Sequence, residues 1–258
     1  GKITTSQDAH QDIISNKDEN YIPAENGSNL TLTIDINIQT IAEKYLKQAV
    51  TEHNCERGGN LIIMDPATGD ILAMATYPNY NLNEPFAPYS DELQAIWDTL
   101  SSSDRTAKLG QVYKDRAVSD GYEPGSTFKI ITLATALNEN LIDLNKDIFH
   151  DSGSIGVENA RIKCWKHGGH GTQTYIQVVQ NSCNPGFVSL GNKLGKERLF
   201  KYIKNFGFGK KTGVDLNGEA SGILFNVDKI GDLELATTAF GQGVSVTPIQ
   251  QVTAVSAA

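Results

Sequence analysis

Residues 60–75, NLIIMDPATGDILAMA, place two short apolar runs on either side of a polar turn. Both runs have the length of a strand, and Pro66-Ala67-Thr68-Gly69 between them is typical of the turn in an antiparallel hairpin. Apolar residues between Ile38 and Val50 precede the hairpin at alternating spacings of three and one, which predicts an amphipathic helix. A helix packed on an antiparallel sheet places the chain in the α+β class.

The rest of the chain divides by composition. The first thirty residues are polar and end in a turn-rich stretch, so residues 1–30 are expected to be a linker and residues 31–258 a domain. A short strand is expected at residues 30–34, where Leu or Ile alternates with Thr. Residues 77–117 are rich in Tyr, Pro, Asn and Asp, which predicts an irregular functional lobe. The second half is expected to be a helical subdomain, with helices near residues 174–180, 185–194 and 197–205.

Composition excludes several classes of protein. The 258 residues are 39% apolar and 20% charged, as in an ordinary globular protein. With 22 Lys and Arg against 30 Asp and Glu, the net charge is −8, so nucleic acid is not an expected partner. No apolar run approaches the roughly 20 residues of a membrane-spanning helix, so the protein is soluble or its anchor precedes these residues. Three cysteines are too few for a disulfide scaffold, and Cys55 has no evident partner.

Ser126 and Lys129 form an S-x-x-K pattern at the expected start of a helix. Pro124 and Gly125 stop the preceding segment, and a spacing of three puts the two side chains on one helical face. A serine is a weak nucleophile until a base is adjacent, and a lysine becomes that base only if its pKa is lowered. The apolar run after Lys129 favours such burial. The alternative is a serine N-cap beside an exposed lysine, which is the commoner meaning of a bare S-x-x-K.

Ser182-Cys183-Asn184 is a second candidate motif, lying between two expected helices. In serine acyl-transfer enzymes of the S-x-x-K type, an S-x-N element brings a hydroxyl into the proton relay and an amide to the substrate. A lone S-x-N is also a common loop sequence. Its order and distance after Ser126 and Lys129 are what make it informative.

Several ordered motifs resemble class B penicillin-binding proteins, the monofunctional D,D-transpeptidases of peptidoglycan, of the elongation or sporulation type. The similarity runs from about residue 30 to the end of the chain. The motifs are Ile34-Asp35-x-x-Ile38-Gln39, Met64-Asp65-Pro66-x-Thr68-Gly69-Asp70-Ile71-Leu72-Ala73-Met74, Arg116-Ala117-Val118-x-x-x-Tyr122-Glu123-Pro124-Gly125-Ser126-Thr127-Phe128-Lys129, Phe206-Gly207-Phe208-Gly209-x-x-Thr212-Gly213 and Gly241-Gln242-Gly243-x-x-x-Thr247-Pro248-x-Gln250.

The resemblance implies a transpeptidase fold like that of serine β-lactamases, and a function. Ser126 would be the acylated nucleophile, Lys129 its general base, and Ser182 and Asn184 the second motif. A donor stem peptide would lose its terminal D-alanine, and an amine of a neighbouring stem would resolve the acyl-enzyme. Penicillins and other β-lactams would acylate the same serine. The alternatives are a serine β-lactamase or carboxypeptidase, and a non-catalytic module that binds stem peptides or β-lactams.

Resemblance also implies a cellular place. Class B proteins carry a membrane anchor and a pedestal domain ahead of the transpeptidase, so residues 1–30 would be the end of that linker. The catalytic domain would face the outside of the bacterial cytoplasmic membrane and contribute to cell wall and cell shape. Its expected partners are peptidoglycan and a membrane glycosyltransferase.

The third motif of the family, Lys-Thr/Ser-Gly on an edge strand, follows the Gly-Gln-Gly segment. No such motif occurs between Gly243 and Ala258, so we expect a domain truncated before it, with its C-terminal part missing. The strand would supply one oxyanion-hole N–H, and losing one donor costs about 10²–10³ in rate. We therefore expect the chain alone to be a poor enzyme. Lys211-Thr212-Gly213 matches literally, but it precedes Gly241 and is interpreted as a surface turn.

A possible metal site lies between the two catalytic motifs. Asp151, Cys164, His167, His170 and Cys183 are residue types that bind zinc. Unrelated thiols and histidines, or a Cys164–Cys183 disulfide, would also explain them. Some elongation-type class B enzymes bind zinc through Asp, Asp, His and Cys; Asp151, Cys164, His170 and Cys183 resemble those positions, with Cys164 replacing the second Asp. His167 is the rival to His170. Four protein ligands would make the zinc structural.

Overall fold

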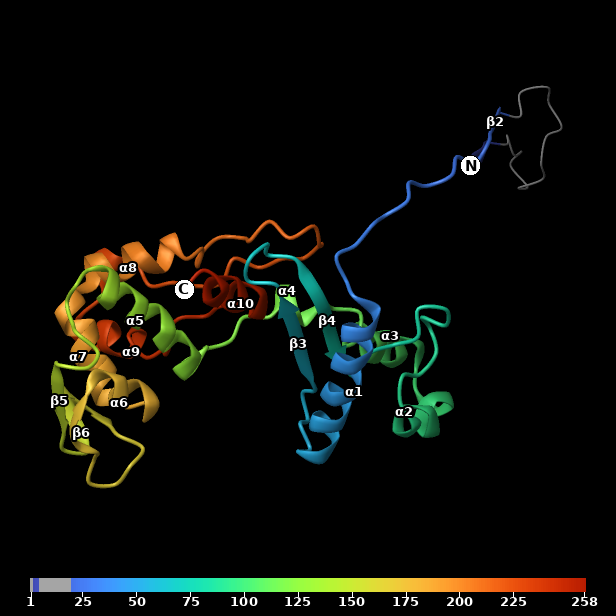
Figure 1. Ribbon diagram of the computed structural model, residues 1–258. Coiled ribbons are helices and arrows are strands. Elements are labelled where there is room, and N and C mark those ends of the chain that lie inside the picture. The colour runs from blue at the N-terminus through green and yellow to red at the C-terminus, as the bar shows by residue number, and fades with distance from the viewer. Residues whose placement is uncertain (1, 5–19) are drawn as a thin grey trace. The chain divides into compact units, whose positions relative to one another are not determined.

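The computed structural model describes residues 2–4 and 20–258 and divides into two units, Gly1–Thr33 and Ile34–Ala258 (Figure 1). In the first unit, β1 (Lys2–Thr4) pairs antiparallel with β2 (Asn20–Ile22). Residues 1–30, expected to be a linker, thus contain one short strand pair, and residues 1 and 5–19 lie outside the described residues. Within the described part, no helix is both long enough and apolar enough to cross a membrane.

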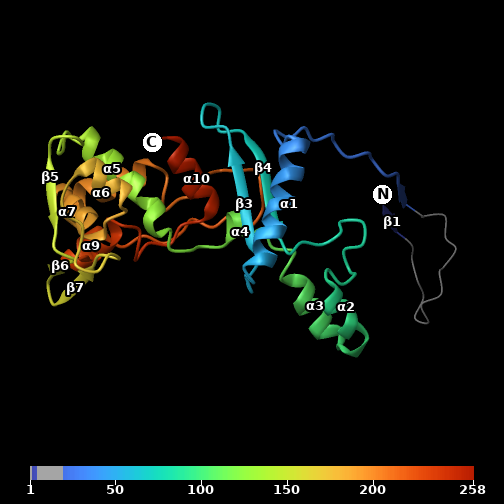
Figure 2. The same cartoon turned by 60° about the horizontal axis from the view of Figure 1, so that its bottom comes forward.

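The second unit begins with the predicted helix and hairpin. Helix α1 (Ile36–Glu52) starts where the Asp35 carboxylate accepts the N–H groups of Asn37 and Ile38, at 2.8 and 3.1 Å. It contacts an antiparallel hairpin of β3 (Gly59–Met64) and β4 (Ile71–Tyr77), as Figure 2 shows. Both predictions are confirmed.

The strand expected at residues 30–34 is wrong. No strand is assigned there, and Leu30 and Leu32 are 78% and 64% exposed. An alternating pattern forms a strand where one of its faces is buried, and neither leucine finds such a face.

The lobe expected to be irregular contains short helices. These are α2 (Asp91–Ile96), η1 (Trp97–Thr99), α3 (Ser102–Gly110) and α4 (Arg116–Ser119). The side chains of Ser90, Ser101 and Asp115 cap α2, α3 and α4 by accepting backbone N–H groups. Those caps were the available signal in a segment too short and polar to show helical periodicity.

The predicted helical subdomain is present. Helices α6, α7 and α8 lie close to the three expected ranges, and the core between α5, α7, α8 and α9 includes the fully buried Ile131, Val188, Leu190 and Leu199. The elements are η2 (Gly125–Phe128), α5 (Lys129–Asn138), α6 (Tyr175–Gln180), α7 (Asn184–Leu194), α8 (Lys196–Asn205), η3 (Val227–Lys229), α9 (Asp232–Thr238) and α10 (Pro248–Ser256).

Two small strand pairs between α5 and α6 were not predicted. Strand β5 (Ile148–Asp151) pairs antiparallel with β8 (Gly171–Thr174), and β6 (Ser154–Val157) pairs with β7 (Ala160–Lys163). Each strand has four residues, which is too short to show a clear period. Together they bring residues 151 and 164–170 to the first turn of α7.

The Gly241-Gln242-Gly243 segment holds the loop that carries Ser126. The Gly125 N–H donates to the Gly241 carbonyl at 2.9 Å, and the Gly243 N–H donates to the Glu123 carboxylate at 2.8 Å. Gly241 has a φ of +84°, and a Cβ there would lie 2.1 Å from the Gly125 carbonyl oxygen. This position therefore requires glycine for its conformation and for the close backbone contact.

We expect Gly241→Ala to destabilise the protein more than a matched glycine substitution. Gly218→Ala is the control, because its φ is +80° and a Cβ there would meet no atom within 4 Å. Gly218→Ala loses only the free energy needed to hold an alanine in the left-handed conformation, about 1–2 kcal/mol. Gly241→Ala must also displace the Gly125 carbonyl. Urea unfolding would measure both free energies of unfolding. Equal losses of unfolding free energy in the two variants would contradict this role of the contact between Gly241 and Gly125.

Candidate active site and metal cluster

Ser126 lies in the 3-10 turn η2 and is exposed to solvent. The α-helix itself, α5, begins at Lys129. The predicted helix start is thus one turn later than Ser126, and the serine approaches the helix through the tighter 3-10 geometry, which is common at helix N-termini.

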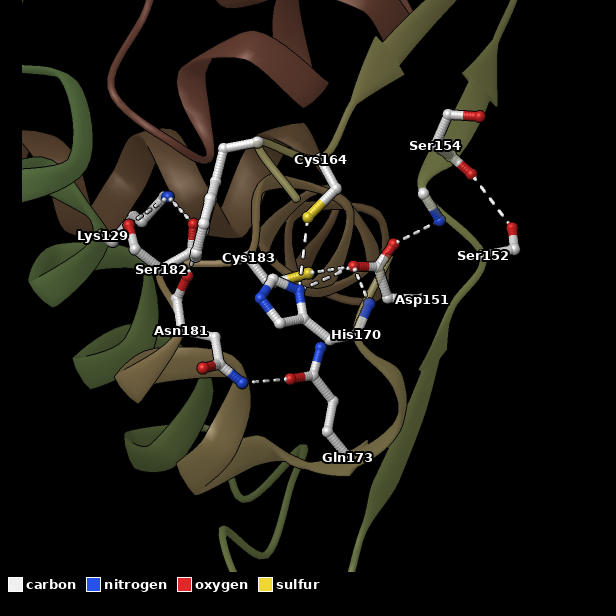
Figure 3. Close-up of polar contacts among 12 residues, drawn as sticks. Lys129, Asp151, Ser152, Ser154, Cys164, His170, Gln173, Asn181, Ser182 and Cys183 are labelled. Carbon is white, nitrogen blue, oxygen red and sulfur yellow. Dashed lines mark hydrogen bonds and ion pairs between the residues drawn. The ribbon is translucent and has the colours of Figure 1, made fainter. Parts of the chain in front are cut away.

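The four predicted catalytic residues lie together. The Ser182 hydroxyl donates to Ser126 Oγ at 3.1 Å. Lys129 Nζ donates to Ser182 Oγ at 2.9 Å (Figure 3). Lys129 Nζ also contacts the Ser182 carbonyl at 2.8 Å and Asn184 Oδ1 at 2.7 Å. Among the described residues no hydrogen bond joins Lys129 Nζ directly to Ser126 Oγ. The hydrogen bonds of the structure therefore connect these two side chains through the Ser182 hydroxyl.

The environment of Lys129 suits a general base. The residue is only 4% exposed, and this burial lowers the pKa of its amine to about 8, against the opposing influence of the Cys183 and Cys164 thiols. The Phe187 ring lies 5.2 Å from Nζ. A base is most effective when its pKa lies near the working pH, so a lysine near 8 is far more useful than an exposed one.

Asp151, Cys164, His170 and Cys183 form a second cluster directly behind the S-x-N motif. One ligand atom from each residue lies within 4.8 Å of the others. His170 Nδ1 is 3.0 Å from Asp151 Oδ2 and 3.3 Å from Cys164 Sγ, and Cys183 Sγ is 3.4 Å from the same carboxylate oxygen (Figure 3). His167, the rival ligand, is exposed and does not belong to the cluster.

Charge in the cluster is concentrated on Asp151. Burial opposes its ionisation, but hydrogen bonds from Cys164, His170 and the Gly153 N–H hold the pKa of this carboxyl far below its usual range. Burial raises the pKa of Cys183 to about 12 and also raises that of Cys164. Both thiols are free, so the structure contains no Cys164–Cys183 disulfide. His170 Nε2 is buried without a hydrogen-bond partner.

The literal Lys211-Thr212-Gly213 lies in an exposed loop without strand structure. The buried Glu219 carboxylate closes the loop by accepting the N–H and hydroxyl of Thr212, both at 2.6 Å. This placement agrees with its interpretation as a surface turn.

Two residues near the site were missed by sequence reasoning. Glu123 binds the Gly243 N–H, and Trp165 donates its indole N–H to the Asn181 carbonyl at 2.7 Å. A tryptophan between two metal-ligand types, in an otherwise polar segment, was the available signal.

Comparison with known proteins gives consistent results. The family described as "Penicillin binding protein transpeptidase domain" matches residues 59–258. The chain is 48% identical over 258 residues to "Stage V sporulation protein D" of Bacillus subtilis, covering all of this chain and 37% of that protein. It is 30% identical over 250 residues to "Peptidoglycan D,D-transpeptidase FtsI" of Buchnera aphidicola, covering 97% of this chain and 39% of the relative. The chain thus spans about two fifths of these relatives.

Solved structures share the fold. A crystal structure of a peptidoglycan glycosyltransferase from Burkholderia ambifaria superposes with a TM-score of 0.72 at 27% identity, covering 88% of this chain and 60% of the other. The apo transpeptidase domain of penicillin-binding protein 3 from Burkholderia pseudomallei gives 0.71 at 25% identity, with 90% and 59% covered.

We predict that Lys129 titrates with a midpoint near pH 8, because burial disfavours its charged form. The neutral amine needed by a base is then the minority below this pH and the majority above it. NMR of 13Cε-labelled lysine from pH 6 to 11 would show one resonance shifted from the group near 10.5. Lys129→Met assigns that resonance by removing it. A set of lysines that all titrate above pH 10 would contradict the prediction.

Proposed function

The chain belongs to the penicillin-binding protein transpeptidase family, and we propose that it catalyses serine acyl transfer on peptidoglycan stem peptides. The observation that carries the proposal is the hydrogen-bonded series from Ser126 through Ser182 to the buried Lys129. It joins a solvent-exposed nucleophile to a base whose pKa lies near neutrality. The similarity to a protein named peptidoglycan D,D-transpeptidase supports the substrate class.

The acylation step uses these contacts with neutral Lys129, because the amine can then accept a hydrogen bond from Ser182 and the Ser182 oxygen can accept one from Ser126. Ser126 Oγ attacks the carbonyl carbon of the terminal D-Ala-D-Ala bond, its proton passes to Ser182 Oγ, and the Ser182 proton passes to neutral Lys129. The carbon–nitrogen bond then breaks, the proton returns along the same route to the leaving nitrogen, and D-alanine departs. An amine of a second stem attacks the ester carbonyl, the ester carbon–oxygen bond breaks, and the amine proton passes through Lys129 and Ser182 to Ser126 Oγ, which forms the cross-link and frees Ser126. Asn184 Oδ1 accepts a hydrogen bond from Lys129 Nζ, which leaves Asn184 Nδ2 free to donate to the substrate.

The oxyanion formed in each step needs N–H donors. The backbone N–H of Ser126 would supply one, and the family's Lys-Thr/Ser-Gly strand would supply the other. A polypeptide restricted to residues 1–258 offers the first alone, so we expect its acylation to be about 10²–10³ slower than that of a polypeptide carrying both.

Penicillin should add once to Ser126, because its strained amide occupies the place of the scissile bond. Intact mass spectrometry would show the mass of one penicillin added, and Ser126→Ala would abolish the addition. Ser103→Ala, on the exposed surface of α3, is the matched control and should be acylated normally. An adduct on Ser126→Ala, or a folded protein that carries the Lys-Thr/Ser-Gly strand and takes none, would overturn the proposal. Rapid release of hydrolysed penicillin would instead indicate a β-lactamase.

We further propose that Asp151, Cys164, His170 and Cys183 bind a structural Zn²⁺. Ligand atoms around tetrahedral zinc lie roughly 3.3 to 3.8 Å apart, and the three contacts between cluster atoms measure 3.0, 3.3 and 3.4 Å. The metal would replace thiol protons and neutralise the buried carboxylate. It would cross-link the strand pairs to the residue between Ser182 and Asn184 and so hold the second motif in place.

Zinc removal should lower thermal stability and slow acylation. Elemental analysis should find one Zn²⁺ per chain, and His170→Ala should abolish it. His167→Ala is the matched control from the same loop and should retain the metal, because His167 is exposed and outside the cluster. An unchanged melting temperature in a strong chelator would contradict the zinc proposal.

We also propose a setting from the relatives. The domain would act outside the cytoplasmic membrane of a bacterium, next to a membrane glycosyltransferase that makes the glycan strands. The 48% identity to stage V sporulation protein D supports a role in the spore or cell wall.

A further inference from the structure

Trp165 is an exposed aromatic residue at the edge of the site. It follows Cys164 in the segment between β7 and β8, and 70% of its surface is exposed. Its indole N–H donates to the Asn181 carbonyl at 2.7 Å, and its ring lies edge-on to His170, with centroids 5.3 Å apart. So exposed a ring gains little from hydrophobic burial. Its hydrogen bond to the Asn181 carbonyl and its ring contact with His170 therefore account for most of what Trp165 can contribute to the stability of this region.

The hydrogen bond from Trp165 acts on a strained residue. Ser182 has a φ of +48°, the left-handed region that side chains other than glycine seldom occupy. Such a conformation persists only where the surroundings hold it. Its φ is the rotation about the bond from its own nitrogen to Cα, so the plane between Asn181 and Ser182 is one of the two peptide planes that set the direction of the Ser182 side chain.

Both ends of that peptide plane are held. The Ser182 N–H donates to the Val179 carbonyl at 2.9 Å, and the Asn181 carbonyl accepts the Trp165 N–H on the other side. The Val179 contact lies within the last turn of α6 and moves with that helix. Trp165 is the contact that comes from another part of the chain.

The next peptide plane is held in the same way. The Cys183 N–H donates to the Val178 carbonyl at 3.0 Å, and the Ser182 carbonyl accepts Lys129 Nζ at 2.8 Å (Figure 3). Lys129 is already part of the proton relay. Trp165 thus completes a set of four contacts around a serine that must face both Ser126 and Lys129.

We propose that Trp165 is a positioning residue for acyl transfer, which orients the Ser182 hydroxyl by holding the Asn181 carbonyl. The kinetic part of this inference rests on the proposed function. Without the indole N–H, the peptide plane rotates more freely and the Ser126 to Ser182 contact is populated less. The chemical step slows, while binding of the ligand before reaction is unaffected.

Two substitutions test this in the zinc-loaded protein. Trp165→Phe keeps an aromatic ring and removes the N–H. Replacing Trp165 by benzothienylalanine, in a Trp97→Phe background, removes the N–H and keeps the shape, so a folding defect is avoided. Trp97→Phe alone is the control, because Trp97 packs on Arg105 in the lobe of residues 77–117, away from the site. We expect the limiting rate of acylation by benzylpenicillin to fall about three- to tenfold, with its pre-acylation dissociation constant and the zinc content unchanged.

A second readout does not depend on acylation. Amide hydrogen exchange of Ser182 and Cys183 should accelerate in both Trp165 variants and stay unchanged in Trp97→Phe. Unchanged exchange would overturn the proposal, and so would a weaker dissociation constant with an unchanged limiting rate, which would mean that the ring contacts the ligand. If wild-type protein that carries the Lys-Thr/Ser-Gly strand takes no penicillin, the proposed function fails, and hydrogen exchange still decides the role of Trp165.

Discussion

A lysine amine removed from water is the constraint on which the site depends. Lys129 is 4% exposed, and its three N–H donors find three acceptors, all on Ser182 and Asn184. An uncompensated buried ammonium would cost several kcal/mol, so α5 and the first turn of α7 have one favourable arrangement. Ser126 precedes Lys129 by less than one helical turn, and that arrangement therefore also places the proposed nucleophile.

The backbone of Ser182, which provides two of these acceptors, is strained, and the surrounding elements hold it in that conformation. Ser182 can offer both its carbonyl and its hydroxyl to one amine because its backbone is left-handed, with φ at +48°. Helix α6 holds this turn from one side and Trp165 from the other. On the opposite side of the nucleophile, the Gly241 carbonyl fixes Gly125. Helices far apart in sequence are thus joined through short polar contacts to backbone atoms, on top of an apolar core.

Sequence reasoning identified the parts whose signals are local. The hairpin of β3 and β4 has a turn between two apolar runs, α1 has a 3.6-residue period, and Ser126, Lys129, Ser182 and Asn184 have recognisable spacing. The strand at residues 30–34 failed because alternation gives no information about what is buried. Strands β5 to β8 depend on tertiary contacts. Family patterns, not local periodicity, assigned the Ser182 hydroxyl to the proton relay and preferred His170 to His167. A four-residue polar strand has no periodicity to detect.

Residues 182–184 belong both to the hydrogen-bonded series from Ser126 to Lys129 and to the cluster of Asp151, Cys164, His170 and Cys183. Ser182 faces Ser126 and Lys129, Cys183 is fully buried against Asp151, and Asn184 returns to Lys129. Three consecutive residues thus serve two neighbouring sites in alternation. A shift of one residue would put the thiol into the relay and a hydroxyl into the cluster, and both would lose their chemistry. The contact between Cys183 and Asp151 therefore determines that Ser182 and Asn184 face Lys129. The contacts of the buried Lys129 with Ser182 and Asn184 in turn determine that Cys183 faces Asp151.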